Sequence, residues 1–523
     1  MQAIFKPHSV HQQTLFPLDL NVLIPENHSA RLIDSVVEKL EIPDIISQYK
    51  GGGTSSYHPK MLIKILCYGY LNNTYSCRKI AQSVKENIYF MWLSGGLQPD
   101  FRTINDFRGQ KLKGSIEKLF SQLVEMMVDL DLISLEKQFI DGTKIEANAH
   151  KYSFVWKKSV EKNKAKLHQK INTVLSEIGQ AIESDLIHTQ NQEEITIDSQ
   201  KLEEKIQAIN QNTKTAFLSK KQKKTVEKLE KEQLPKLQEY EKHLENLGDR
   251  NSYSKIDTDA TFMRMKEDHM KNGQLKAAYN VQISTENQII THFSVHQKST
   301  DFTTLESHLE GFKNAYDKTS KQIIADAGYG SEENYQMLEQ QQMEFFIPYN
   351  MYRMEQKRKH KNNLFHTQNL YHNIELDFLV CPMGQRMEKI YTKESKTTTG
   401  FLQQHSVYQA QNCQGCPMRG QCFNAKGNRR IEINHNLQRL KAKARENLEN
   451  KEGKEIYAKR CIEPEPVFGN IKQNKHFKRF SLRKLTKINI EFGLVAIAHN
   501  FAKWIEKIRL LGFIQNHRVI ECF

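Results

Sequence analysis

Two aspartates are placed as carboxylates that could bind a metal ion. Asp141 follows the apolar run QFI and precedes Gly142, and Asp326 follows QIIA in front of Ala327 and Gly328. Each pattern predicts a buried strand ending at an acidic residue, where open α/β sheets place their ligands. Two such carboxylates on neighbouring strands would need a cation, and Mg²⁺ prefers oxygen ligands. The alternative is that each Asp only forms a turn.

A third carboxylate, Glu465, lies between Pro464 and Pro466. The prolines exclude it from the middle of a helix, and Pro466 suits the first turn of a helix that begins there. Glu465 would then stand at the positive end of that helix, which favours a carboxylate. Glu463 is the alternative acidic residue. Lys472 lies two turns along the same helix face, where it could contact a DNA phosphate.

Aromatic and basic residues flank Glu465 on both sides. Tyr457 and Arg460 are three residues apart and could share a helix face that points at DNA. The basic residues after Glu465 that could hold the DNA backbone are Lys472, Lys475, Lys478, Arg479, Arg483 and Lys484. The alternative is that they form a solvated charged face.

Four of the eight cysteines have the spacing of zinc ligands. Cys413, Cys416 and Cys422 form a C-x2-C-x5-C pattern, and Cys381 lies upstream in VCPMG. Four thiolates from short turns match a structural Zn²⁺ site, for which His405 is a substitute ligand. The alternative is a set of reduced, unligated thiols in a loop-rich insertion.

The composition favours a polyanionic partner. The 523 residues include 76 Lys and Arg against 61 Asp and Glu, a formal net charge of +15. Neutralising phosphates releases counterions and drives association with DNA. Anionic membrane surfaces are the rival partner, but no apolar run is long enough to span a bilayer. The N-terminal MQAIFKPHSV lacks the features of a secretory signal, so we expect a cytoplasmic protein.

The elements that must position these residues change in character along the chain. Residues 1–130 are predicted to be a helical domain, with apolar spacing typical of helices over 28–40, 59–71, 76–87 and 114–130. Basic and aromatic residues between these helices could form a helix-turn-helix-like DNA reader, and a dimerisation or packing domain is the alternative. These residues are Tyr75, Arg78, Lys79, Phe101 and Arg102.

The rest of the chain predicts an α/β sheet of mixed direction. Residues 277–296 have the alternation of an antiparallel hairpin with one buried face, and helices and strands alternate over 302–349. Residues 155–250 have helical spacing with alternating charges, which indicates an inserted helical hairpin. Helices are expected over 471–480 and 485–505. The predicted domains are 1–130, 131–349 including that insertion, a cysteine-bearing insertion over 350–455, and 456–523.

The chain resembles the DDE transposases of bacterial insertion sequences in FIDGTKIEANAHKYSFVWKKS, IADAGYGSEEN and EPVFGNIKQNKHFKRF. The stretch from HPKMLIKILCYGYL to DFRTINDFR looks like the family's helical N-terminal domain. The resemblance implies an RNase H-like catalytic core in which Asp141, Asp326 and Glu465 hold two Mg²⁺ or Mn²⁺ ions. The family's Tyr, Arg, Glu, Lys motif falls on Tyr457, Arg460, Glu465 and Lys472, with one extra residue between the Arg and the Glu.

The reaction that the resemblance implies is cleavage at the ends of a mobile element followed by joining to target DNA. One metal ion would activate the attacking water and the other would stabilise the leaving 3′ oxygen. The expected partner is double-stranded DNA, and pairing two ends implies a homodimer or higher oligomer. Asp257, Asp259 and Asp301 are interpreted as structural or DNA-orienting residues.

Three other functions are alternatives to this one. The first is a transposase-derived DNA-binding protein that has lost catalysis, and the presence of all three acidic residues argues against it. A metal-dependent nuclease without strand transfer leaves the helical N-terminal domain without a role. A coiled-coil scaffold over 155–248 leaves the α/β core unexplained.

Overall fold

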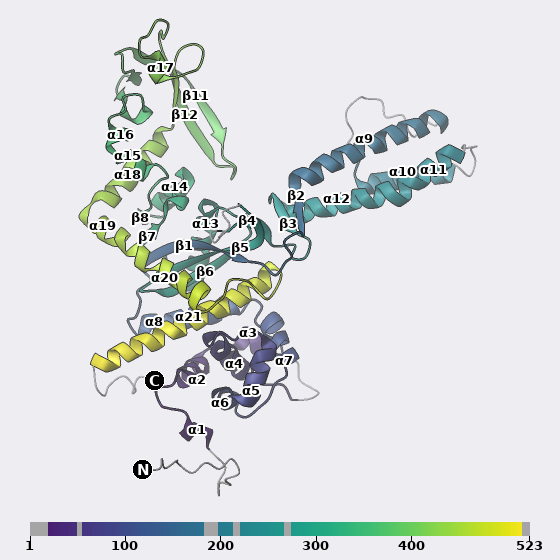
Figure 1. Ribbon diagram of the computed structural model, residues 1–523, viewed down its shortest axis with the longest axis vertical. Helices are drawn as coiled ribbons and strands as arrows, with labels where there is room; N and C mark the ends of the chain where they lie inside the picture. Colours follow the sequence, from purple (N-terminus) through teal and green to yellow (C-terminus); the bar gives the residue numbers. More distant parts are fainter. Residues whose placement is uncertain (1–18, 50–54, 183–196, 213–219, 266–272, 515–523) are drawn as a thin grey trace, which may run out of the picture.

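A six-stranded mixed sheet lies at the centre of the molecule (Figure 1). The computed structural model describes residues 19–49, 55–182, 197–212, 220–265 and 273–514. The sheet has the order β4-β5-β1-β7-β8, and β6 pairs with β5. The strands are β1 (Lys137–Glu146), β4 (Thr261–Arg264), β5 (Leu275–Glu286), β6 (Ile289–His296), β7 (Gln322–Ala325) and β8 (Glu344–Phe346).

The strand directions are mixed because both hairpins and helical crossovers connect the strands. β5 and β6 form an antiparallel hairpin, and β1 is antiparallel to β5. β7 is parallel to β1 and to β8, with helices in the connections. The predicted mixed α/β architecture and the helical N-terminal region are both confirmed.

Two details of the predicted strands are wrong. β1 does not end at Asp141 but continues to Glu146, because residues from Gly142 onward still pair with β5. The hairpin does not have one buried face: Asn280, Gln282 and Ser284, the polar residues of β5, are fully buried along with its apolar residues. Helices therefore have to cover both faces of the sheet.

One face of the sheet is covered by α13 (Leu305–Tyr316), α14 (Glu332–Gln340) and α18 (His435–Glu449), which share a core with Ile140 and Ile323. The other face meets α8 (Ile116–Asp129), α20 (Pro464–Gly469) and α21 (Leu485–Ile514). α19 (Lys451–Ala458) packs beside them, over Phe139 and Ile324. The alternation of Phe139 and Ile140 between these two cores follows from the two-residue period of a strand.

The N-terminal helices share one hydrophobic core with the sheet. They are α1 (Leu20–Leu23), α2 (Ser29–Lys39), α3 (Pro43–Ile46), α4 (Pro59–Leu71), α5 (Cys77–Glu86), α6 (Ile88–Leu93), α7 (Phe101–Asp106), the π-helical turn η1 (Phe107–Lys111) and α8. The long helix α21 packs against α4 and α8 on one side and β6 on the other (Figure 1). Among the described residues, no helix is both long and apolar enough to cross a membrane.

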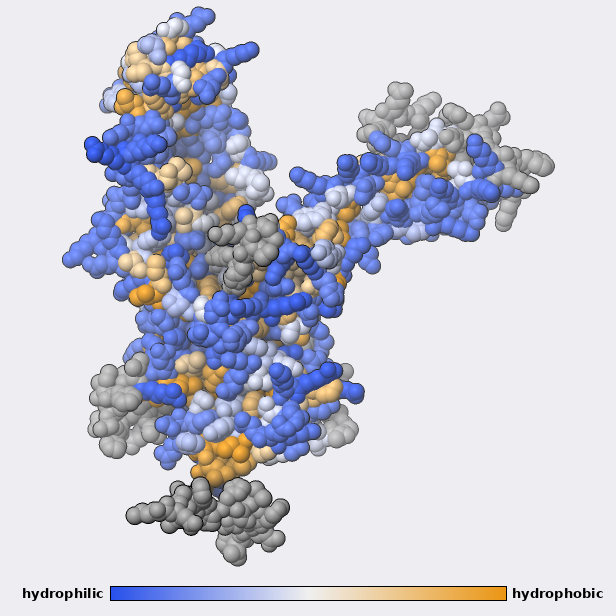
Figure 2. All heavy atoms as spheres, viewed as in Figure 1, coloured by the Kyte–Doolittle hydropathy of each residue, from blue (hydrophilic) through white to orange (hydrophobic). Residues whose placement is uncertain are grey.

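A helical arm extends from the sheet (Figure 1). It begins and ends at two short paired strands, β2 (Phe154–Trp156) and β3 (Ser252–Ser254). Its helices are α9 (Lys157–Ile182), α10 (Ser199–Asn212), α11 (Lys220–Lys228), the π-helical turn η2 (Leu229–Gln233) and α12 (Leu234–Leu247). Apolar residues such as Ile171, Leu202 and Leu237 form a separate core inside the arm, and most of its visible surface is hydrophilic (Figure 2).

The cysteine-bearing segment contains a second, antiparallel sheet that the sequence did not predict. Its order is β13-β12-β11-β10-β9. The strands are β9 (Tyr371–Asn373), β10 (Phe378–Val380), β11 (Arg386–Lys396), β12 (Leu402–Ala410) and β13 (Arg430–Ile433), and short helical pieces lie around them at α15 (Tyr352–Glu355), α16 (Arg358–Lys361) and α17 (Arg419–Cys422). Much of β11 is exposed, so it lacks the alternating burial pattern by which a strand is recognised.

The helix predicted over 471–480 is correct only at its start. After α20 the chain forms the π-helical turn η7 (Asn470–Asn474) and then leaves the helix. His476 has a positive φ of 55°, and Phe480 N–H donates to the Glu146 carbonyl at 2.8 Å. The segment thus runs along the end of β1, where Phe477 and Phe480 are buried.

Asn500 of α21 provides a test of how this helix is fixed to the sheet. Its side chain accepts from Ile290 N–H at 2.9 Å and donates to the Ile290 carbonyl at 2.8 Å, and it is fully buried. We expect Asn500→Ala to lower the free energy of unfolding by about 2–4 kcal/mol, because two buried backbone groups lose their partners. Chemical denaturation followed by circular dichroism measures the change.

The matched control is Asn489→Ala on the same helix, whose side chain makes an exposed contact with Glu117. It should change the free energy of unfolding by less than about 0.5 kcal/mol. If both substitutions lower the free energy of unfolding by the same amount, the two hydrogen bonds between Asn500 and Ile290 do not have this role.

Candidate active site

The parallel pairing of β1 with β7 brings the two predicted aspartates together. Its last pair is Ile140 with Ala325, so Asp141 and Asp326 are the next residues on the two strands. Here β7 ends and the chain turns into the 3₁₀ turn η4 (Ala327–Tyr329), while β1 continues beside β5. The two carboxylates therefore stand side by side at the point where the sheet opens.

Backbone N–H groups hold each of these carboxylates. Asp141, which is buried, accepts from the N–H of Gly142 at 2.9 Å. Asp326 accepts from the N–H of Gly328 at 2.8 Å and caps η4. Hydrogen bonds of this kind stabilise the charged form of a carboxylate.

Arg460 lies among the predicted acidic residues. Its guanidinium donates to Glu465 at 3.2 Å, with side-chain exposures of 14% for Arg460 and 49% for Glu465. Burial by itself would lower the pKa of Arg460, but Tyr457, Asp141, Asp326 and Glu465 together raise it above its usual value. α19, the 3₁₀ turn η6 (Lys459–Ile462) and α20 thus bring Tyr457, Arg460 and Glu465 near Asp141 of β1 and the end of β7.

Glu463 and Glu465 have different surroundings although they are two residues apart. Glu463 is buried and accepts from the N–H of Gln288, in the turn between β5 and β6, at 2.8 Å. Burial raises its pKa. Glu463 therefore fastens α20 to the hairpin, whereas the half-exposed Glu465 faces Arg460.

The predicted DNA-contacting residues do not form one free surface. Lys478 and Arg479 are exposed, and Arg479 also donates to the Ala149 carbonyl at 2.9 Å. Lys472 is buried, and Lys475 donates to the Leu71 carbonyl at 2.5 Å. For Lys475 the expected phosphate contact is replaced in this structure by a contact with the N-terminal helices.

The same junction explains one of the aromatic residues assigned to a DNA reader. Tyr75 donates to the Lys475 carbonyl at 2.7 Å and packs edge-on against Phe477. Arg78 and Arg102 instead stack on Phe101, with guanidinium carbons 5.1 and 5.8 Å from the ring centre. Tyr75 therefore joins the helical region to the core and does not face outward.

Two acidic residues near the core have structural roles, as interpreted from the sequence. Asp257 is buried, accepts from Tyr279 at 2.9 Å and also accepts from the backbone of Lys484 at 3.0 Å. Asp259 accepts from the N–H of Leu485 at 2.8 Å. Together they bind free N–H groups at the start of α21.

Asp301, interpreted from the sequence as structural or DNA-orienting, has partners that the sequence does not indicate. Asp301 accepts at one oxygen from Asn280 at 2.8 Å and from Gln282 at 3.0 Å, and Tyr329 donates to the other end of Gln282. The alternation of β5 predicts that its polar residues face solvent. It therefore does not indicate that they are buried or which groups they bind. The signal in the sequence for these partners is the close spacing of the amide side chains on β5.

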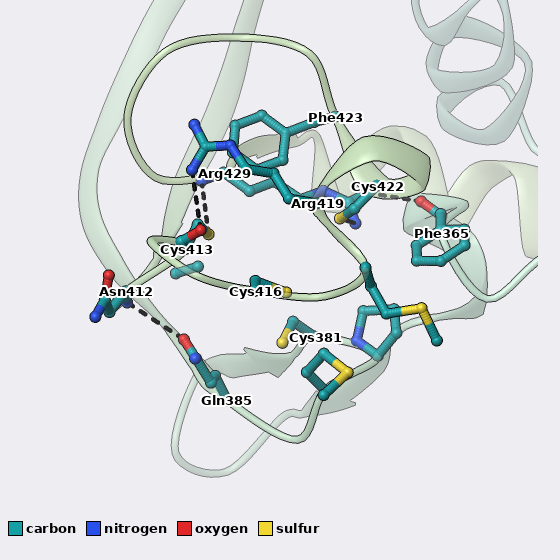
Figure 3. A pocket seen from close by; sticks show the side chains of 14 residues that line it. Phe365, Cys381, Gln385, Asn412, Cys413, Cys416, Arg419, Cys422, Phe423 and Arg429 are labelled. Carbon is teal, nitrogen blue, oxygen red and sulfur yellow. Dashed lines mark hydrogen bonds between the residues drawn. The ribbon is translucent and has the colours of Figure 1, made fainter.

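The four predicted zinc ligands lie around one pocket in the second sheet's domain (Figure 3). Cys413 Sγ accepts from the backbone N–H of Arg429 at 3.4 Å, and Cys422 Sγ accepts from the Arg429 guanidinium at 3.0 Å. His405 is not among the residues that line this pocket.

Across the part of the chain that the structure describes, no group of three or more His, Cys, Asp or Glu side chains is arranged so that it could hold a metal ion. In the cysteine pocket, Arg429 contacts two of the sulfurs, and the expected zinc site is not preformed. Near the end of β7, the cationic Arg460 pairs with Glu465 and interacts electrostatically with Asp141 and Asp326.

Comparison with known proteins yields two family matches. Residues 380–505 match a transposase DDE domain, and residues 18–110 match a transposase domain known as DUF772. The first match includes the cysteine pocket, Arg460 and Glu465, whereas Asp141 and Asp326 lie outside it. No curated protein matches the chain.

The two matched segments meet in the structure, because α21 in the DDE segment packs against α4 in the DUF772 segment. A DDE transposase domain is a phosphoryl-transfer unit that acts on nucleic acid. Both matches are to transposase domains, and together they support a DDE transposase of an insertion sequence.

Proposed function

We propose that this protein is the DNA transposase of an insertion sequence, which binds the element's terminal inverted repeats and catalyses metal-dependent strand cleavage and strand transfer at the bacterial nucleoid. The observation that supports it most is the pairing of Ile140 with Ala325, which sets Asp141 beside Asp326, with Arg460 and Glu465 next to them. These residues come from segments more than a hundred positions apart in the sequence.

We further propose that the central sheet is an RNase H-like core. An antiparallel β6-β5-β1 unit followed by the parallel strands β7 and β8 supports this assignment. The proposed domains are the helical region 1–130, the core 131–349 with the insertion 155–250, the cysteine-bearing insertion 350–455, and the C-terminal part 456–523.

The donor set fits the divalent ions that the family implies. Asp141, Asp326 and Glu465 offer only carboxylate oxygens, the ligands that Mg²⁺ and Mn²⁺ prefer. The Arg460 guanidinium lies where these negative charges converge, which indicates that the site is built for positive charge. Two bound ions would supply activation of the attacking oxygen and stabilisation of the leaving 3′ oxygen.

The chain's own residues would bind and orient the DNA. Asp141 and Asp326 are already fixed by backbone N–H groups, so little reorganisation is needed in the reaction. Arg460, which pairs with Glu465 beside them, can pair with a phosphate there. Lys478 and Arg479 are exposed beyond the end of β1, where they would contact the DNA backbone.

The proposed partner is double-stranded DNA, at the element ends and at the target. The formal charge of +15 supports binding to phosphates. Joining two ends at one target requires two active sites, so we propose that the protein acts as a homodimer or higher oligomer.

We also propose that the cysteine pocket binds a structural Zn²⁺ ion. Cys381, Cys413, Cys416 and Cys422 are the thiol donors that zinc prefers, and they line a single pocket. The N–H groups of Arg429 that reach Cys413 and Cys422 would stabilise thiolates, as donors around metal-bound sulfurs do. Zinc would fasten the loop that carries these residues and take no part in the reaction.

The first test is cleavage of labelled duplexes that carry the element's own terminal repeats. We expect cleavage with Mg²⁺ or Mn²⁺, none with EDTA, and a loss of at least about 100-fold in Asp141→Asn and Asp326→Asn with DNA binding retained. Binding without cleavage in the unmodified protein would indicate a DNA-binding protein without catalysis. Cleavage without joining to target DNA would indicate a nuclease.

The two neighbouring glutamates allow a matched comparison. Glu465→Gln should lose cleavage by at least about 100-fold, because a neutral amide cannot replace a charged ligand. Glu463→Gln keeps an oxygen that accepts from Gln288 and should retain cleavage within about threefold. Loss of cleavage in Glu463→Gln but not in Glu465→Gln would indicate that Glu463 is the third metal ligand.

Zinc binding is tested by the metal content of the purified protein. We expect about one zinc per chain by mass spectrometry, and loss of most of it in Cys416→Ser. Cys461→Ser is the matched control because Cys461 is exposed and does not line the pocket. If the purified protein is folded but contains no zinc, the result supports the alternative that the four cysteines are reduced and unligated.

A further inference from the structure

We infer that Asp301 is a positioning residue of the active site, which holds the turn carrying Asp326 against the strand carrying Asp141. The inference rests on the proposed function. Asp301 begins the 3₁₀ turn η3 (Asp301–Thr303), and its position in the sequence does not indicate that it lies close to Asp141 or Asp326.

Asp301 is fixed by amides from the middle of the sheet. Its Oδ1 atom accepts from Asn280 Nδ2 at 2.8 Å and from Gln282 Nε2 at 3.0 Å. Both donors are on β5 and are fully buried. Two hydrogen bonds to one charged oxygen in a buried setting are strong, and removing the acceptor would leave one N–H group on each amide without this partner, although Gln282 also donates to Asn280.

Gly142 makes this arrangement sterically feasible. It lies directly opposite Gln282 in the pairing of β1 with β5. A methyl group on Gly142 would lie 2.4 Å from Gln282 Nε2 and 2.8 Å from Asp301 Oδ1. The amide and the carboxylate therefore occupy the space that any side chain at 142 would need, immediately next to Asp141.

The same network reaches the turn that carries Asp326. Tyr329, fully buried in η4, donates its hydroxyl to Gln282 Oε1. Burial raises the pKa of Tyr329 well above its usual value, and the carboxylates of Asp301, Asp141 and Asp326 raise it further, so the hydroxyl keeps its proton and donates. A methyl group on Gly328 would lie 3.9 Å from Asp301 Oδ2, so the second oxygen faces this turn.

Asp301 thus takes part in a side-chain network that connects three elements. η3 is tied to β5 by the two amides, and β5 is tied to η4 by the Tyr329 hydroxyl. Cation binding by two carboxylates depends on their separation, and supporting residues around metal ligands commonly change affinity by about 10–100-fold. The expected consequence of losing Asp301 is a weaker divalent-ion site in a protein that still folds.

The experiment measures Mn²⁺ binding to the full chain by electron paramagnetic resonance, without DNA. Asp301→Ala should weaken Mn²⁺ binding by about tenfold or more. Asp301→Asn keeps an Oδ1 atom for both amides and should remain within about threefold of the unmodified protein. Asp317→Asn, the same change at the far end of α13, is the matched control and should have no effect.

Gly142→Ala is a second variant that disturbs the network from the other side. The groups it would strike are the ends of two side chains, so the strand can persist while Gln282 and Asp301 are displaced. We expect a loss of Mn²⁺ affinity like that of Asp301→Ala. Hydrogen exchange in the absence of metal should show faster exchange over residues 326–331 in both variants and normal exchange in Asp301→Asn.

Failure of the inference and failure of the proposed function give different results. Asp301→Ala with unchanged Mn²⁺ affinity and exchange, in a protein whose unmodified form cleaves element ends, overturns the inference alone. If Asp301→Asn binds Mn²⁺ as weakly as Asp301→Ala does, the inference that Asp301 acts through the hydrogen bonds of its Oδ1 atom is overturned. The loss of affinity would then follow from the loss of its charge. An unmodified protein that neither binds Mn²⁺ nor cleaves overturns the proposed function, and the inference with it.

Discussion

The arrangement of the whole site depends on where one pair of parallel strands stops. β1 and β7 are joined up to Ile140 and Ala325, and beyond that pair only β1 continues, held by β5. A carboxylate on each strand at the next position is forced to lie beside the other. Where β7 turns away from β1, η6 and α20 bring Arg460 and Glu465 close to these carboxylates. Two like charges at the end of a strand pair are unfavourable unless positive charge is near, and Arg460 provides positive charge close to both.

Much of this could be predicted because the signals are local. A strand that runs into an acidic residue and glycine is visible at Asp141 and at Asp326, and α4 begins and ends where its apolar spacing does, at Pro59 and Leu71. The proline on each side of Glu465 marks the start of α20 in the same way. Hydrophobic period and proline placement act within a few residues, so one sequence is enough to read them.

The parts that were missed depend on contacts between distant segments. The 471–480 stretch has enough helical spacing to predict a helix, but its backbone pairs with Glu146 of β1 and its phenylalanines fill the junction. Asn280 and Gln282 look like solvent-facing residues of a hairpin until Asp301 and Tyr329 are found against them. Lys475 looks like a phosphate ligand until Leu71 supplies its acceptor. Tertiary partners decide each of these cases, and local propensity cannot predict them.

The position of α21 in the fold has a consequence for how the chain is made. α4, almost entirely buried, packs against α21 across more than 400 intervening residues, and Asn500 of α21 completes the hydrogen bonding of β6. At about 5–20 residues per second, the ribosome delivers α21 roughly 20–80 s after α4 has emerged. During that interval the surfaces of α4 and α8 that α21 covers stay exposed. The helix bearing Glu465 appears only shortly before α21. The newly made polypeptide is therefore vulnerable to aggregation and to chaperone capture until α21 has followed Glu465 out of the ribosome.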